Sequence, residues 1–264
     1  RIVDPLRAAG HDVHVETLAP EIPFPFPWPI VEFFDAFPEC VQLDAPPLRA
    51  LEVAADTTFD LVILTYQVWY LSPALPMTAF LKSEEGRKLI DGKPVITLVA
   101  CRNMWLSAQE TMKQLIAGAG GRLIDHLAFT DQGHPLATFI TTPRWVWTGK
   151  KNSFLGLPPA GVSPEEIRQA SRFGLALADG LNNYREKSGQ PMLAGLRAVT
   201  VNVRLAVSER AGRRAFGVWS KLVRLFGKRG QWRRRPVLLL VGDYLITLIV
   251  TVVPIILVLH WLLS

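Results

Sequence analysis

The sequence predicts an α/β protein that ends in a membrane anchor. Short apolar runs of strand length alternate with segments at helical spacing over residues 1–188, which is the pattern of a parallel sheet covered by helices on both faces. A dense run of Lys and Arg follows, and residues 237–263 are almost entirely apolar. We therefore expect three parts: an α/β domain over residues 1–188, a basic amphipathic segment over 189–235 and one transmembrane helix within 236–264.

Four segments are expected to form strands. Residues 12–18 alternate Val13, Val15 and Thr17 with polar neighbours, as a half-buried strand does. Residues 60–66 (DLVILTY) and 94–101 (PVITLVAC) are short continuous apolar runs, which are typical of strands buried on both faces of a sheet. Residues 121–129 are the fourth candidate.

Three helices are expected between and after these strands. The first covers residues 76–89. The S-A-Q-E of residues 107–110 has the spacing of a capping box, so the second helix is expected to open there and run to residue 118. The S-P-E-E of residues 163–166 repeats this spacing with Pro at the first helical position, and an apolar stripe behind it continues to about residue 187.

Two aromatic segments have no clear periodicity. Residues 21–39 alternate Pro with aromatic residues, which excludes a central strand and favours a stiff flap. This flap could cover an apolar pocket or only pack over the sheet. Residues 133–151 are aromatic and basic and are expected to form a long surface loop. Alternatively, Arg144, Lys150 and Lys151 could reach an anionic ligand from this loop.

The positive charge of the chain is concentrated in one stretch. Residues 204–235 contain eleven Lys and Arg and a single acid, Glu209, whereas the whole chain has a net charge of +6. Basic residues beside a transmembrane helix favour the cytoplasmic side and attract anionic lipid headgroups. Such a run can also bind nucleic acid, but the apolar segment beside it favours membrane lipids as the partner, with no nucleic acid.

The segment 211–230 is predicted to be an amphipathic helix. An apolar face at helical spacing separates from Arg and Lys on the other side, which is typical of a helix lying in the membrane interface. The same pattern also fits a helix that packs on the body of the protein. The members of the apolar face are Ala215, Phe216, Trp219, Leu222, Val223 and Phe226.

Residues 237–263 are long enough to cross a bilayer. At about 1.5 Å per residue a helix over this stretch would reach roughly 40 Å, against the ~30 Å hydrocarbon core of a membrane. Asp243 lies near the start of the stretch, where its carboxylate can stay at the headgroup level. The sequence therefore predicts a single-pass C-terminal anchor in the cell inner membrane, with the α/β domain in the cytoplasm.

Two loops are the candidate functional site. Ligands of parallel α/β sheets bind beyond the carboxyl ends of the strands. The loops that follow residues 60–66 and 94–101 both mix large aromatic rings with hydrogen-bonding groups, as a flat heteroaromatic ligand requires. Alternatively, these rings only seal the edge of the core. The candidate residues are Tyr66, Gln67, Trp69, Tyr70, Cys101, Arg102, Asn103 and Trp105.

The cysteines do not indicate a metal site or a nucleophile. Cys40 and Cys101 show no CxxC spacing and cannot form a zinc site alone, so the pair fits a reducing compartment. No His follows Cys101 at a position that suggests a catalytic pair.

With these elements in place, residues 1–188 resemble the flavodoxin-like superfamily, in particular the NAD(P)H-dependent quinone and FMN reductases. The stretch DLVILTYQVWYLSPALPMTAFLKS is similar to the third strand and following loop of that family, and PVITLVACRNMW is similar to its fourth strand and loop. The resemblance implies a doubly wound parallel sheet whose first strand and phosphate-binding loop are missing from this sequence.

The same resemblance implies FMN as the cofactor, with NAD(P)H as a candidate for a second one. Trp69 and Tyr70 would flank the flavin ring. Backbone groups near Gln67 and over residues 101–103 would bond its edge. Arg102 would stabilise a reduced anionic flavin or a substrate enolate.

More narrowly, the order PFPFPW, FFDAFPE, ACRNMW and FITTPRWVWTGKK before a basic stretch and an anchor resembles the dialkylresorcinol condensing enzymes. Carbon–carbon condensation of this kind belongs to thiolase-fold ketosynthases, and this chain does not supply their Cys/His/His or Cys/His/Asn set. The resemblance therefore implies a redox step on a lipophilic quinone or a cyclic ketone or resorcinol-type substrate, in dialkylresorcinol or aryl polyene-type lipid biosynthesis.

The alternative is a non-catalytic scaffold of this fold that holds a biosynthetic partner protein at the membrane. A flavodoxin-like electron carrier fits less well, because such carriers are usually soluble and acidic.

Overall fold

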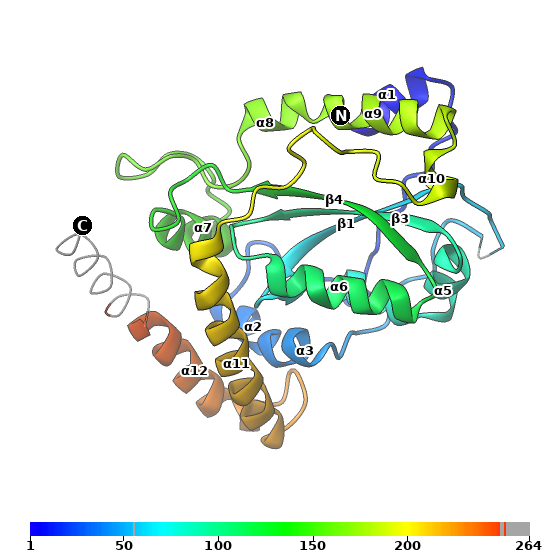
Figure 1. Ribbon diagram of the computed structural model, residues 1–264. Coiled ribbons are helices and arrows are strands. Elements are labelled where there is room, and N and C mark those ends of the chain that lie inside the picture. Colours follow the sequence, from blue (N-terminus) through cyan, green and yellow to red (C-terminus); the bar gives the residue numbers. More distant parts are fainter. Residues whose placement is uncertain (55, 249–250, 252–264) are drawn as a thin grey trace.

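The protein is a mixed α/β structure built on a four-stranded sheet (Figure 1). The computed structural model describes residues 1–54, 56–248 and 251. Three strands run parallel: β1 (Val62–Trp69), β3 (Pro94–Cys101) and β4 (Arg122–Thr130). The two-residue β2 (Ser72–Pro73) pairs antiparallel with the end of β1, which gives the strand order β2-β1-β3-β4.

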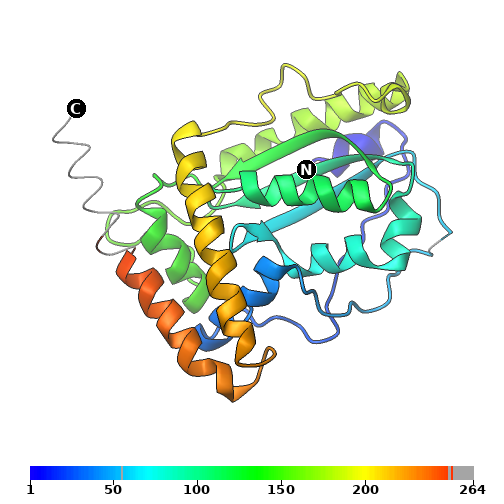
Figure 2. The same ribbon diagram turned by 60° about the horizontal axis from the view of Figure 1, so that its bottom comes forward.

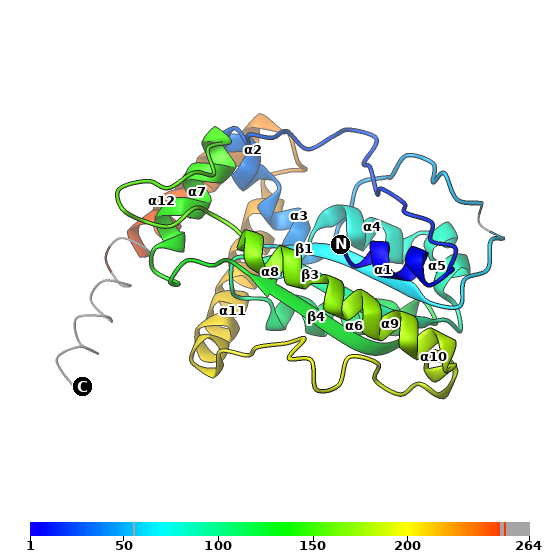
Figure 3. The ribbon, with the colours of Figure 1, turned by 90° about the horizontal axis from the view of Figure 1, so that it is seen from above.

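Helices cover both faces of this sheet, as the sequence predicts. One core cluster contains buried side chains of α6 (Leu106–Gly118), α4 (Leu75–Lys82) and α5 (Glu84–Ile90) packed on β1 and β3. The opposite cluster contains α1 (Val3–Ala8) and α9 (Ser171–Asn182), which lie across the other face of the sheet (Figure 3). This second core extends to Met192 and Leu193, beyond the predicted domain boundary at residue 188.

β1 departs from the prediction of a strand buried on both faces. Leu64 and Tyr66 are buried against α6, but Thr65 and Gln67 point to the other face and are exposed. The apolar run DLVILTY therefore includes a half-exposed strand: Ile63 packs against the cluster of α1 and α9, but Thr65 and Gln67 on the same face are exposed. By contrast, β3 is buried on both faces over its first four residues.

The prediction of a strand over residues 12–18 is wrong. These residues have no regular secondary structure, and the extended chain makes only one isolated bridge, from Pro20 to Leu48. The carboxylate of Glu16 instead accepts hydrogen bonds from the backbone N–H groups of Glu52 and Val53, at 3.0 Å each. Alternation shows only that one side of a segment is buried, and it does not supply a neighbouring strand edge.

The prediction of a helix over residues 76–89 is correct in position, but the segment forms two helices instead of one. α4 and α5 are separated at Ser83, which has an extended backbone. The hydroxyl of Ser83 accepts a hydrogen bond from the backbone N–H of Gly86 at 2.9 Å, so Ser83 caps α5. A cap residue inside an apolar stripe ends one helix and starts the next.

The two predicted capping boxes have different outcomes. Ser163 caps α8 (Pro164–Gln169), because its hydroxyl accepts a hydrogen bond from the N–H of Glu166 at 3.1 Å. Ser107, however, lies inside α6 and caps nothing. α6 begins one residue earlier, at Leu106, and the N–H of Ser107 is bound by a side chain from a distant helix. The predicted stripe after Ser163 continues through α8, α9 and α10 (Arg185–Ser188).

The predicted flap, residues 21–39, contains the short helix α2 (Ile30–Asp35) and the start of α3 (Phe37–Gln42). Phe34 and Phe37 of these helices are buried. The segment 133–151 is also partly helical, since α7 spans Thr138–Thr148, and the prediction of a long surface loop is wrong there. The guanidinium of Arg144 bonds the backbone oxygens of Lys150 and Asn152, so it closes the end of its own segment rather than pointing to a ligand.

The basic part of the chain forms a helical hairpin on the side of the domain (Figures 1 and 2). α11 (Val203–Leu225) is followed by the 3-10 turn η1 (Trp232–Arg234) and by α12 (Arg235–Thr247). We call residues 203–248 the C-terminal hairpin. The two helices bury a third apolar cluster against the flap, which includes Phe34, Phe37 and Val223.

This packing corrects the predicted membrane face of the amphipathic helix. Val223 is fully buried, Phe216 contacts the rings of Phe37 and Tyr70, and Trp219 contacts the ring of Tyr244. The apolar face identified in the sequence therefore lies mainly on the body of the protein. Among the described residues, no helix is long and apolar enough to cross a membrane. Of the predicted transmembrane helix, residues 249–250 and 252–264 lie outside the described residues.

Candidate functional site

The two candidate loops leave the same edge of the sheet. β1 and β3 are parallel neighbours, and Gln67 lies opposite Ala100 near their carboxyl ends. The loops that begin at Tyr70 and Arg102 therefore start from adjacent positions, as the sequence predicts for a parallel sheet. We call this edge the crest of the sheet.

The flap holds the aromatic residues of the first loop. The ring of Trp69 packs edge-on against Phe24 at 5.0 Å and against Trp28 at 5.4 Å. The hydroxyl of Tyr70 donates a hydrogen bond to the backbone oxygen of Phe33. Tyr70 is in the left-handed region with φ of 51°, which a non-glycine residue adopts rarely and which turns its ring under the flap. Trp69 and Tyr70 are therefore engaged by the chain itself.

The candidate residues Tyr66 and Gln67 belong to strand β1, which runs past the predicted end at residue 66, and they lie on opposite faces of it. Tyr66 is buried, and its hydroxyl donates to the side-chain oxygen of Gln109 at 2.8 Å. Burial raises the pKa of the Tyr66 hydroxyl, so this group stays protonated. Gln67 is exposed, and its side-chain oxygen accepts a hydrogen bond from the indole N–H of Trp69 at 3.1 Å.

At the start of the second loop lie a largely buried thiol, that of Cys101, and a partly desolvated cation, that of Arg102. Burial, with a smaller effect of the Glu209 charge, raises the pKa of the Cys101 thiol to about 12. The thiol is therefore protonated at neutral pH and is a poor nucleophile. The guanidinium of Arg102 lies 3.9 Å from the ring centre of Phe139 on α7. Desolvation lowers the pKa of Arg102 to about 10, partly offset by Asp131, so the side chain keeps its charge at neutral pH.

Asn103 and Trp105 have different surroundings. The side-chain oxygen of Asn103 is buried and has no hydrogen-bond partner within the described structure. An unpaired buried acceptor is costly, so it marks a place where a ligand donor could bind. Trp105 points into the core instead, where it is 5% exposed and contacts His126 at 4.9 Å. The rings of Trp69 and Trp105 therefore belong to separate clusters and do not form the two walls of one site.

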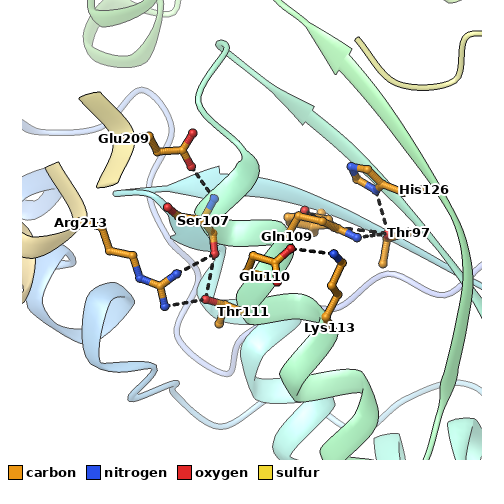
Figure 4. Close-up of polar contacts among 10 residues, drawn as sticks. Thr97, Ser107, Gln109, Glu110, Thr111, Lys113, His126, Glu209 and Arg213 are labelled. Atoms are coloured by element: carbon orange, nitrogen blue, oxygen red, sulfur yellow. Dashed lines mark hydrogen bonds and ion pairs between the residues drawn. The ribbon is translucent and has the colours of Figure 1, made fainter. Parts of the chain in front are cut away.

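A polar chain runs through the core below the crest (Figure 4). From Tyr66 it passes to Gln109, whose amide N–H donates to Thr97 at 3.0 Å. The hydroxyl of Thr97 lies 2.8 Å from Nδ1 of His126, and Nε2 of His126 is buried without a partner. Burial lowers the pKa of His126 to about 4, so the imidazole is neutral at physiological pH.

α11 closes the start of α6 beside the crest. The carboxylate of Glu209 accepts a hydrogen bond from the backbone N–H of Ser107, and Arg213 donates to the backbone oxygen of Ser107 at 3.1 Å (Figure 4). Glu209 is 1% exposed. A helix N-terminus attracts anions, and here an anion from the chain itself occupies the first turn of α6.

Sequence reasoning missed this closure. Glu209 is the only acid among the eleven basic residues of 204–235, and Arg213 follows it by one helical turn. A single acidic residue in an otherwise basic helix indicates a specific binding partner for that acid, because exposure to solvent alone does not account for its presence. The partner itself, Ser107, could not be identified, since it is about a hundred residues away in the sequence.

The residues at the crest fit a flavin only in part. The unpaired oxygen of Asn103 and the cation of Arg102 suit the polar edge of such a ring. Trp69 and Tyr70 do not fit as stacking partners, because the flap already occupies them. We therefore derive no reaction step through FMN.

Two surface hollows of the described structure lie away from the crest. One, of about 390 Å³, lies between α11 and α12, and the other, of about 620 Å³, is lined by Gln132, Lys151 and Arg168 among others. None of the eight candidate residues lines either hollow. In the described part of the chain, no group of three or more His, Cys, Asp or Glu could hold a metal ion.

Comparison with known proteins adds no relative to this picture. No protein-family model, no curated protein and no solved structure matches the chain.

Proposed function

We propose that this chain works at an anionic membrane surface, which it contacts through the outer face of the C-terminal hairpin. The observation that carries the proposal is a row of large apolar side chains that are exposed on this hairpin. Val207, Val218 and Leu225 of α11 are 72%, 69% and 82% exposed, and Trp232 in the connecting turn is 70% exposed. Isolated exposed apolar residues are common, but a row along one hairpin marks an interaction surface.

The row follows one side of α11. Val207, Ala211, Val218, Leu222 and Leu225 recur at helical spacing and are all exposed. They lie opposite the side that carries Glu209 and Val223, which is buried against the domain. The helix is therefore apolar on two sides, one for the core and one for a partner.

Basic side chains flank this row. Arg210, Arg214 and Lys221 are exposed on α11, and Lys228, Arg233 and Arg235 are exposed around the turn. Each Lys or Arg near an anionic membrane contributes about 1 kcal/mol of binding free energy. Apolar side chains between basic ones are the composition of interfacial helices. We also propose that the C-terminal segment 236–264 anchors the chain in the membrane as a single-pass helix, with the α/β domain on the cytoplasmic side.

Membrane fractionation tests this proposal. The full 264-residue chain should be recovered in the membrane fraction of expressing cells. If the anchor spans the bilayer, the chain should resist extraction by high salt and by alkaline carbonate. If only the hairpin face binds, these washes should release it, and Leu225→Glu should weaken binding whereas Leu175→Glu, at an exposed leucine of α9, should not. Recovery of the unmodified chain in the soluble fraction before any wash would refute both parts.

For the chemistry, we propose an FMN-dependent oxidoreductase that acts on a lipophilic quinone, cyclic ketone or resorcinol-type substrate, with NAD(P)H as the hydride source. The crest supports this assignment through Asn103 and Arg102, which offer an unpaired acceptor and a desolvated cation beside the end of β1. When bound, FMN supplies the redox chemistry. A substrate dissolved in the bilayer would reach such a site without crossing water.

The alternative is a scaffold of the same fold that binds no cofactor and holds a biosynthetic partner protein at the membrane. It is favoured by a specific observation, because Trp69, Tyr70 and Trp105 are all packed within the protein and none is free to stack on a ligand ring.

An absorption spectrum separates the two proposals. The full chain, purified in a nonionic detergent and incubated with FMN, should retain the bands of oxidised flavin after gel filtration if it is a flavoprotein. Arg102→Met should reduce the retained flavin, whereas Arg172→Met, at an exposed arginine of α9, should leave it unchanged. A colourless protein that takes up no FMN would favour the scaffold.

A further inference from the structure

The surface hollow between α11 and α12 has two aromatic walls. Trp219 of α11 and Tyr244 of α12 both line it, and their ring centres are 5.4 Å apart with the ring planes inclined by 42°. At this separation the two rings pack against each other and form one joined aromatic surface in the hollow. The hollow measures about 390 Å³, which is within the size range of small-ligand sites.

A single carboxylate lines the same hollow. Asp243 precedes Tyr244 on α12 and is exposed. Within the described part of the chain, its carboxylate makes no hydrogen bond and no ion pair. This isolation is unusual, since residues 204–235 beside it supply eleven Lys and Arg, of which Arg224 and Arg234 do pair with acids.

We infer that this hollow binds the ammonium headgroup of a zwitterionic phospholipid, an inference that rests on the proposed membrane location. An ammonium or trimethylammonium group is attracted to the faces of Trp and Tyr rings through cation–π interaction. The carboxylate of Asp243 adds a direct charge interaction with the same group. Leu240 and Leu248 line the hollow beside Thr247 and Thr251 and provide apolar surface for the lipid chains.

The complementary charges argue against an anionic headgroup at this position. A phosphatidylglycerol headgroup has no cation for the rings, and its phosphate would be repelled by Asp243. The hairpin would therefore use two kinds of lipid contact: a diffuse attraction of its exposed Lys and Arg to anionic lipids, and one specific site for a zwitterionic lipid.

Fluorine NMR of the 5-fluorotryptophan-labelled full chain in a maltoside detergent tests this site. The resonance of Trp219 is assigned by its loss in Trp219→Phe. The titrants are dihexanoylphosphatidylcholine and dihexanoylphosphatidylglycerol, whose identical chains give a matched correction for partition into the micelle. The choline lipid should shift the Trp219 resonance saturably, and the glycerol lipid should not. Asp243→Asn should weaken choline-lipid binding about tenfold, whereas Asp60→Asn, at an exposed acid far along the chain, should have no effect.

Three outcomes would overturn the inference. Equal shifts with both lipids would show that only the chains bind. Unchanged affinity in Asp243→Asn would remove the carboxylate from the site. Equally tight binding of butyltrimethylammonium would assign the hollow to a free cation instead of a lipid. A chain that fails to reach membranes in the fractionation experiment but binds the choline lipid here would refute the proposed function and leave the site standing. The reverse result would refute the site alone.

Discussion

Replacement of Arg234 by Ala is expected to destabilise the folded chain by about 3–5 kcal/mol. Arg234 is fully buried at the start of α12, and its guanidinium makes two hydrogen bonds of 2.9 Å to the carboxylate of Glu39. Its Nε lies 3.0 Å from Oδ1 of Asp35. Removing the cation leaves the largely buried carboxylates of Glu39 and Asp35 without their cationic partner, which costs far more than the loss of an exposed ion pair. The measurement is the midpoint of thermal unfolding in a nonionic detergent.

Two further variants make this result specific. Arg233→Ala removes the neighbouring exposed arginine and should change stability by less than about 0.5 kcal/mol. Adding Glu39→Gln to Arg234→Ala should recover part of the loss, because one uncompensated charge is removed. If Arg234→Ala melts within a degree of the unmodified protein, the hairpin is not fixed to the flap through this ion pair.

Acid is expected to destabilise the protein through His126 between pH 6.5 and about 4. Burial lowers the folded-state pKa of His126 from 6.5 to about 4. Above pH 6.5 the residue is neutral in both states and costs nothing. Between pH 6.5 and 4 the unfolded chain binds the proton and the folded chain does not, so stability falls by roughly 2–3 kcal/mol over this window. The measurement is the unfolding midpoint as a function of pH.

His126→Gln separates this effect from the other titrations. The variant loses some stability at pH 7.5, since Thr97 loses a partner, but its unfolding midpoint should fall less steeply between pH 6.5 and 4. His134→Gln, at an exposed histidine, should follow the unmodified protein over the whole range. Parallel curves for His126→Gln and the unmodified protein would show that His126 titrates normally and that the polar chain below the crest is not closed to solvent.

The fold class follows from the sequence because the two strongest strands and most helices are specified locally. Residues 94–101 form β3 with the predicted bounds, and Ser163 caps its helix as the capping box predicts. The failures involve partners distant in the sequence. The extended segment 12–18 lacks a strand edge, and the N–H of Ser107 is satisfied by Glu209 rather than by a local cap. Local patterns identify which groups need a partner but not which partner they find.

The candidate site shows the same division. The sequence placed the loops of Trp69 and Asn103 at one edge of a parallel sheet, and β1 and β3 are indeed neighbours with that edge in common. It could not tell which rings remain free, because aromatic residues that seal a core and those that hold a ligand have the same composition. Packing by the flap determines that Trp69 is not free, since Phe24 and Trp28 pack against its ring.

The amphipathic helix illustrates a further limit. α11 is apolar on two sides, and the sequence pattern alone assigned the membrane role to the side of Phe216 and Val223, which the structure packs on the flap. The side of Val218 and Leu225 stays exposed. A helical spacing shows that residues share a side, while only tertiary packing shows which side is left for a partner.

The depth of a spin label on α11 tests the membrane assignment most directly. Nitroxides are attached to Leu225→Cys and, as the matched control, to Leu175→Cys on α9. Both variants carry Cys101→Ser to remove the partly accessible native thiol, while Cys40 is fully buried and can stay. The labelled full chain is reconstituted into vesicles that contain anionic lipid, and the accessibility of each nitroxide to oxygen and to a water-soluble nickel complex is measured. The account predicts that the label at 225 becomes accessible to oxygen and shielded from nickel, while the label at 175 stays in water. Equal exposure of both labels to the nickel complex would contradict it.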